Sequence, residues 1–189
     1  MEPLPPCPTC CGPLGRWGGY ARWARFPDAG DQRLWIRRVR CAACQVSHAL
    51  LPAFLLVRRL DPAATIGAAL TQAAAGQGVR PIAARLGVPH TTVRSWWDRV
   101  RANAATLLPP LLALATRLDS APVDLPADGA PAVLAALDAT WQRVRRRLGA
   151  RTPEVWALWS VVSGGRARAP NTSSPSPPGQ ESRSLVASP

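Results

Sequence analysis

Four cysteines stand in two matched pairs. Cys7 and Cys10 are separated by two residues, as are Cys41 and Cys44, and thirty residues lie between the pairs. Two C-x-x-C turns can bring four thiolates around one Zn²⁺ in tetrahedral geometry, which leaves no position for an activated water. The spacing therefore predicts a structural zinc site.

Two neighbouring residues bear on the ligand set. Cys11 follows Cys10 directly and is an alternative ligand, although the two-residue gap of the second pair favours Cys10. His48 is expected to pack or cap and not to bind the metal.

Redox chemistry is a different use for C-x-x-C pairs, but it needs an exposed thiolate of low pKa, usually at a helix N-terminus in a βαβ setting. Neither pair has that context.

The residues between the pairs predict a β-hairpin. Trp17–Phe26 and Arg33–Arg40 are rich in aromatic and β-branched residues, and Pro27–Asp31 has the composition of a turn. Residues 1–52 are thus expected to form a zinc ribbon that depends on its metal, because so small a unit buries little apolar surface. Alternation from residue 33 to 37 separates arginines from apolar residues. The arginine side is either a nucleic-acid surface or a solvated outer face.

The segment Arg80–Arg101 has the pattern of a helix-turn-helix. Gly87 suits a turn that needs positive φ, and Pro89 cannot continue the preceding helix. Apolar residues recur at helical spacing on both sides of that turn: Ile82, Ala83, Leu86, Val93, Trp96 and Val100. A preceding helix over Pro62–Ala75, with Asp61 as its N-cap, would complete a three-helix unit over residues 53–107.

The outward positions of this unit predict DNA contacts. A recognition helix presents its N-terminal half to base edges in the major groove. The residues expected to read bases are His90, Thr91, Arg94 and Ser95. Those expected to hold phosphates are Arg80, Arg85 and Arg99. The alternative is an ordinary corner of two helices without a ligand.

The charge balance favours a polyanionic partner. The 23 basic residues are all arginine, the formal net charge is +12, and 14 of the arginines lie in residues 1–107 against five acidic residues. The absence of lysine also suits a GC-rich genome, so part of the arginine content reflects composition alone.

No secretory signal or membrane span is expected. The longest apolar run, Ala104–Ala115, is interrupted by Pro109 and Pro110 and is too short to cross a bilayer. We therefore expect a cytoplasmic, nucleoid-associated protein with no membrane partner.

The predicted fold is mainly α with a small β zinc ribbon. The recognition helix is expected to end near Leu107, before the two prolines. Residues 108–164 are expected to form a C-terminal helical extension with helices over Leu111–Leu118 and Pro131–Leu148 and a last one starting near Thr152, which offers a possible homodimer contact. Residues 165–189 have the composition of a disordered tail.

Taken together, these motifs resemble a group of uncharacterised proteins from GC-rich bacteria that is classed as a domain of unknown function. The likeness covers about residues 5–165 and is carried by Cys7-Pro8-x-Cys10, Trp17-Gly18, Arg37–Cys41 with Cys44, and His48–Pro52 ahead of the helix-turn-helix. The N-terminal half also resembles the zinc-binding and helix-turn-helix head of some insertion-sequence transposases. The resemblance implies sequence-specific binding to double-stranded DNA.

Catalysis is not expected from this chain. A transposase needs three carboxylates on an RNase H-like sheet, whereas the 82 residues after Leu107 read as helices and tail. The alternative functions are an RNA-binding or protein-bridging zinc-ribbon adaptor and, behind these, a C-x-x-C redox protein.

Overall fold

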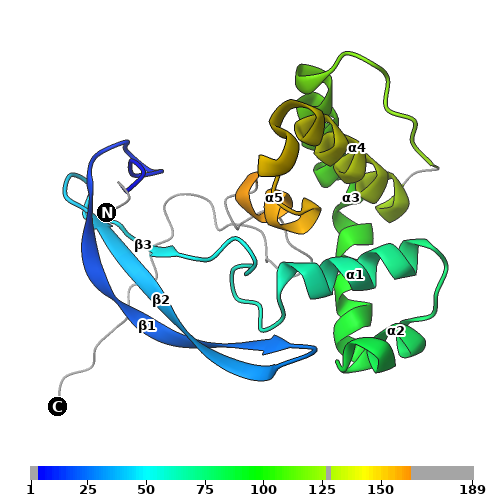
Figure 1. Ribbon diagram of the computed structural model, residues 1–189, viewed down its shortest axis with the longest axis horizontal. Helices are drawn as coiled ribbons and strands as arrows, with labels where there is room; N and C mark the ends of the chain where they lie inside the picture. The colour runs from blue at the N-terminus through cyan, green and yellow to red at the C-terminus, as the bar shows by residue number, and fades with distance from the viewer. Residues whose placement is uncertain (1–3, 127–128, 163–189) are drawn as a thin grey trace.

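The computed structural model describes residues 4–126 and 129–162, with backbone alone for residues 160–162. Three antiparallel strands form one sheet in the order β1 (Leu14–Phe26), β2 (Gly30–Cys41), β3 (Ser47–Leu50). The helical elements that follow are α1 (Ala63–Ala74), α2 (Val79–Leu86), α3 (His90–Leu118), α4 (Ala130–Leu148), the 3₁₀ turn η1 (Gly149–Arg151) and α5 (Val155–Val162). Figure 1 shows the sheet on one side and the helices on the other. A β-hairpin followed by helices is thus confirmed.

The sheet is larger than the sequence predicted. β1 and β2 pair as expected, with a bulge between Arg16 and Gly19. The third strand was not predicted: Ser47–Leu50 pairs with residues 37–40 of β2 as β3. Four residues are too few to show the two-residue alternation by which a strand is recognised.

The segment between β3 and α1 packs against the hairpin. Leu55 is fully buried in a small cluster with Ala24 and Ile36. The prediction that Asp61 is the N-cap of α1 is wrong: the N-cap is Pro62, and the buried Asp61 carboxylate accepts from Arg25 at 2.8 Å. A buried carboxylate needs such a partner, so Asp61 ties the sheet to the connector.

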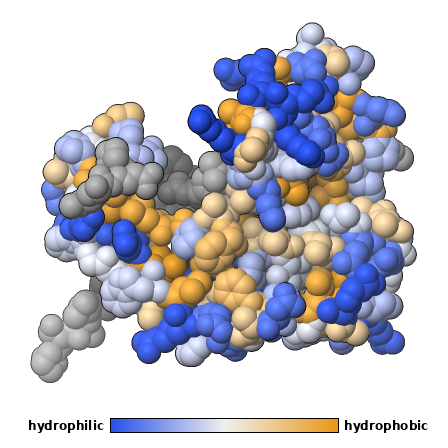
Figure 2. Space-filling view, viewed as in Figure 1, coloured by the Kyte–Doolittle hydropathy of each residue, from blue (hydrophilic) through white to orange (hydrophobic). Residues whose placement is uncertain are grey.

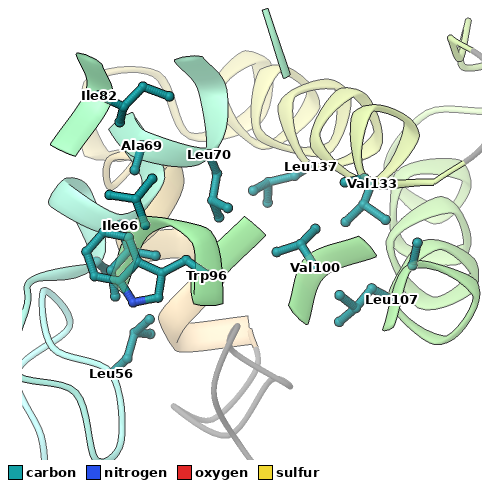
Figure 3. Close-up of a cluster of buried hydrophobic side chains, with 14 of the residues drawn as sticks. Leu56, Ile66, Ala69, Leu70, Ile82, Trp96, Val100, Leu107, Val133 and Leu137 are labelled. Carbon is teal, nitrogen blue, oxygen red and sulfur yellow. The ribbon is translucent and has the colours of Figure 1, made fainter. Parts of the chain in front are cut away.

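The main core lies between the helices. The apolar residues predicted to recur in α2 and α3 pack with those of α1, as Figure 3 shows, with Trp96 beside Ile66 and Leu56. α4 closes the core with Val133 and Leu137, and α5 packs against it with Val155 and other partly buried residues. The apolar faces of α4 and α5 are therefore used inside the chain, and a homodimer contact through these helices would have to use their outer surfaces.

The prediction that the recognition helix ends near Leu107 is wrong, because α3 continues through Pro109 and Pro110 to Leu118. Leu107 and Leu111 are buried in the core shared with α4. Because proline has no N–H, the carbonyls of residues 105 and 106 lose their helical partners. These two residues and both prolines are exposed, so water can hydrogen-bond to the free carbonyls. Burial has therefore outweighed the local cost of proline. The predicted boundary between residues 107 and 108 lies inside one helix, and the predicted tail, 165–189, lies outside the described residues.

α5 crosses α1 at Gly67. A Cβ built on Gly67 would overlap the indole of Trp156. We expect Gly67→Ala to lower the free energy of unfolding by about 1–3 kcal/mol, since overpacking forces the two helices apart. In a Trp156→Ala background the same change should stabilise the protein by up to about 1 kcal/mol, because alanine is the better helix former. Urea unfolding of the four proteins measures both values, and equal effects in the two backgrounds would contradict this contact.

Candidate metal centre and nucleic-acid interface

Four thiols converge at one end of the sheet. The sulfurs of Cys7, Cys10, Cys41 and Cys44 all lie within 4.8 Å of one another, and none forms a disulfide. Cys7 Sγ is 3.7 Å from Cys44 Sγ, and Cys10 Sγ is 3.4 Å from Cys41 Sγ. Four sulfurs bound at 2.3 Å around a tetrahedral cation would be about 3.8 Å apart. The predicted set of four cysteines is therefore brought together with a geometry that fits one metal ion.

The backbone builds both cysteine turns in the same way. The N–H of the residue after each pair, Cys11 and Gln45, donates to the carbonyl of the first cysteine, at 2.8 and 3.1 Å. Both residues have positive φ, 59° and 61°, a conformation that favours glycine. Cys11 is exposed and lies outside the sulfur cluster. Of the two candidates, Cys10 is therefore the one whose sulfur lies in the cluster.

The thiols of the cluster differ widely in pKa. Burial raises the pKa of the Cys7 thiol, but hydrogen bonds from the Thr9 and Cys10 backbones, His48 and Cys44 outweigh it and lower the pKa to about 5. For Cys10 a hydrogen bond from the Gly12 backbone lowers the pKa, but the neighbouring thiols and burial raise it to about 12. A cation held by all four sulfurs must displace the Cys10 proton, so its binding releases protons.

His48 is a contact of the site that the sequence reasoning did not find. Its Nε2 lies 3.4 Å from Cys7 Sγ, and β3 carries it there by pairing residue 48 with Val39. A ring N–H on Nε2 can donate to the sulfur, as outer partners of metal ligands commonly do. His48 is not one of the four residues of the sulfur group, and the expectation that it does not bind the metal stays a prediction.

The second predicted site is the surface formed by α2 and the start of α3. Gly87 ends α2 in the left-handed conformation with φ 63°, and α3 begins at His90. His90, Thr91 and Arg94 are exposed, whereas Ser95, which was predicted to face outward with them, is half-buried. The flanking arginines are all exposed: Arg80, Arg85 and Arg99. Arg85 donates to Gln77 Oε1 at 2.8 Å.

A further arginine joins this flank from the connector. Burial, together with the charges of Arg99 and Arg22, lowers the pKa of Arg59 to about 10. Arg22 donates to the carbonyls of Leu56 and Arg59, which holds the connector against β1. Arg59 and Arg99 are forty residues apart, and no local pattern predicted that they lie near each other. Their mutual repulsion would be relieved by an anion.

Polar side chains are prominent over α2 and over the end of α4 in the surface view of Figure 2.

Among the helices that the structure describes, none combines the length and apolar character that a membrane crossing requires.

Residues 7–96 match the sequence model of a family described as a domain of unknown function, DUF6431. The matched segment includes the four clustered cysteines, the whole sheet, α1, α2 and the start of α3 up to Trp96. No curated protein and no solved structure matches the chain.

Proposed function

We propose that this protein binds double-stranded DNA in a sequence-specific manner, with α2, the Gly87 turn and the start of α3 acting as a helix-turn-helix. The observation that carries the proposal is the division of α3 into two sides. Val93, Trp96 and Val100 are buried, while the opposite side presents exposed polar and basic residues. A helix held from behind, with its first turns free, can enter a major groove.

The charges around α3 support a duplex as the partner. Arginine can form two hydrogen bonds with the O6 and N7 atoms of guanine, and it also binds phosphate. Arg94 and Arg99 are exposed on α3, and Arg80 and Arg85 are exposed on α2. Arg94, Thr91 and His90 are therefore proposed to contact bases and the flanking arginines to contact phosphates. Such a unit would serve a transcriptional regulator or the recognition head of a mobile element. No catalytic reaction is proposed for it.

We further propose that the cysteine site holds Zn²⁺ in a structural role. The support is the donor set, because four sulfur ligands in tetrahedral arrangement are typical of zinc. The ion would fix the two cysteine turns against each other and so hold one end of the sheet.

Arg94→Ala is expected to lose discrimination between DNA sequences. A preferred site would first be selected from a random duplex pool at stated salt, since phosphate contacts make affinity salt-dependent. If Arg94 binds a guanine with two hydrogen bonds, its removal costs about 1–3 kcal/mol, or about 5- to 150-fold in Kd, at that site. Fluorescence anisotropy with the selected duplex and a scrambled duplex measures the loss.

Arg117→Ala is the matched control, because Arg117 is exposed near the other end of the same helix. At 1.5 Å per residue it lies about 35 Å from Arg94, and its removal should leave the preference unchanged. An Arg94→Ala protein that discriminates between the two duplexes as the parent does would refute the base contact. Failure to select any duplex would refute the proposed function itself.

A further inference from the structure

One side of the β1–β2 hairpin carries tryptophans and arginines that are not part of the core. The residues Trp23, Arg33, Trp35 and Arg37 share this side, which we call the tryptophan face. Trp23 is paired with Arg33, and residues 33, 35 and 37 alternate along β2. Trp23 is 55% exposed and Trp35 is 67% exposed, and both arginines are exposed.

The two sides of the hairpin differ in what covers them. On the other side, Ile36 is buried by Leu55 of the connector. Trp17, 54% exposed, has Arg40 stacked over its ring, with the guanidinium carbon 4.6 Å from the ring centroid. No such stacked partner is found for the tryptophan face among the described residues.

The indole of Trp35 lies close to the backbone of the neighbouring strand at Gly19. A Cβ built on Gly19 would be 2.6 Å from Trp35 Nε1 and 2.7 Å from Cε2. The indole therefore rests against the β1 backbone at a position where only glycine leaves it room. The indole nevertheless remains largely open to solvent, because Trp35 is mostly exposed.

From this arrangement we infer that the tryptophan face binds single-stranded nucleic acid, with bases stacked on Trp23 and Trp35 and phosphates held by Arg33 and Arg37. This site is separate from the proposed duplex site on α3. Every base has an aromatic face, and stacking on a side chain contributes about 1–3 kcal/mol per base. In a duplex these faces are already covered, so only unpaired bases can stack on the indoles.

The spacing and charge of the face suit one strand. Trp23 and Trp35 are diagonal neighbours on adjacent strands, a relation that places residues about 7–8 Å apart. An unpaired strand whose bases are unstacked from each other can place one base on each ring. The arginines beside them complement phosphate, which favours a polyanion over an apolar protein surface.

The test measures binding of labelled 12-nucleotide single strands, in DNA and RNA forms, by fluorescence anisotropy at stated salt. Each of Trp23→Ala and Trp35→Ala is expected to weaken binding about 5- to 150-fold. Trp35→Phe should retain more affinity than Trp35→Leu, because phenylalanine keeps a stacking face. Arg33→Ala should reduce the slope of log K against log salt by about 0.7.

Trp17→Ala is the matched control: it removes a tryptophan of similar exposure from the side that does not carry the tryptophan face, and it should leave single-strand affinity unchanged. Arg94→Ala should also leave it unchanged, which separates this site from the duplex site. Equal affinity of the Trp23→Ala/Trp35→Ala protein and the parent for both strands would overturn the inference, as would equal losses in Trp17→Ala. Circular dichroism and metal content confirm that each variant is folded. The ratio of DNA to RNA affinity then identifies the preferred strand.

Discussion

A Cys41→Ser variant is expected to lose its bound metal and, with it, the folded sheet. Cys41 is fully buried, and its sulfur lies 3.4 Å from that of Cys10. Hydrogen bonds, chiefly from the Cys44 backbone, outweigh burial and lower the pKa of this thiol, which prepares it to bind a cation. A serine hydroxyl has a much higher pKa and is a poor zinc ligand. Structural zinc contributes roughly 10–16 kcal/mol in small zinc domains, and the apolar cluster of the hairpin is small.

Cys11→Ser is the matched control, because Cys11 adjoins a ligand but stands outside the sulfur cluster. Elemental analysis of the purified parent and of this control should give about one Zn²⁺ per chain, and iron in its place would correct the proposed metal. Cys41→Ser should give only background metal, with loss of dispersed amide signals from β1 and β2 in an NMR spectrum. Full metal content in Cys41→Ser, or a parent that folds without any metal, would refute the proposed site.

The local patterns were sufficient to predict the cysteine cluster and the α2–α3 turn. Two equal C-x-x-C spacings flank a pair of strands, and the closing of the hairpin then brings Cys10 and Cys41 together. Gly87 has the left-handed conformation that its place after a short apolar helix indicated. In these cases the residues that determine the structure are close in sequence or are joined by a simple hairpin.

Two incorrect predictions and one contact that was not predicted concern residues brought together from different segments. Pro109 and Pro110 are strong local signals for the end of a helix, but α3 continues because its next turns are buried against α4. Asp61 has the sequence context of an N-cap, yet its carboxylate is held by Arg25 of β1. His48 reaches Cys7 only because β3 pairs with β2. The first two outcomes depend on a partner more than twenty residues away, which a local pattern does not contain. The third depends on β3, whose four residues are too few to show strand alternation.

The second large effect is expected for Trp96→Ala, since Trp96 is the largest fully buried side chain, at 1% exposure. It packs among Leu56 of the connector and Ile66 of α1 (Figure 3), so its removal leaves a cavity where three segments meet. Truncation of a buried tryptophan typically costs about 3–5 kcal/mol, a large part of the roughly 5–15 kcal/mol that stabilises a domain.

Trp35→Ala provides the comparison for this change, because it deletes the same side chain from an exposed position. Urea unfolding followed by far-ultraviolet circular dichroism should show a loss of about 3–5 kcal/mol for Trp96→Ala and less than about 1 kcal/mol for Trp35→Ala. Equal losses would mean that Trp96 does not hold the connector, α1 and α3 together.

Trp96 also lies on the buried side of α3, opposite Arg94. A Trp96→Ala protein that remains folded should therefore bind the selected duplex more weakly than the parent, because the helix that presents Arg94 is less firmly held.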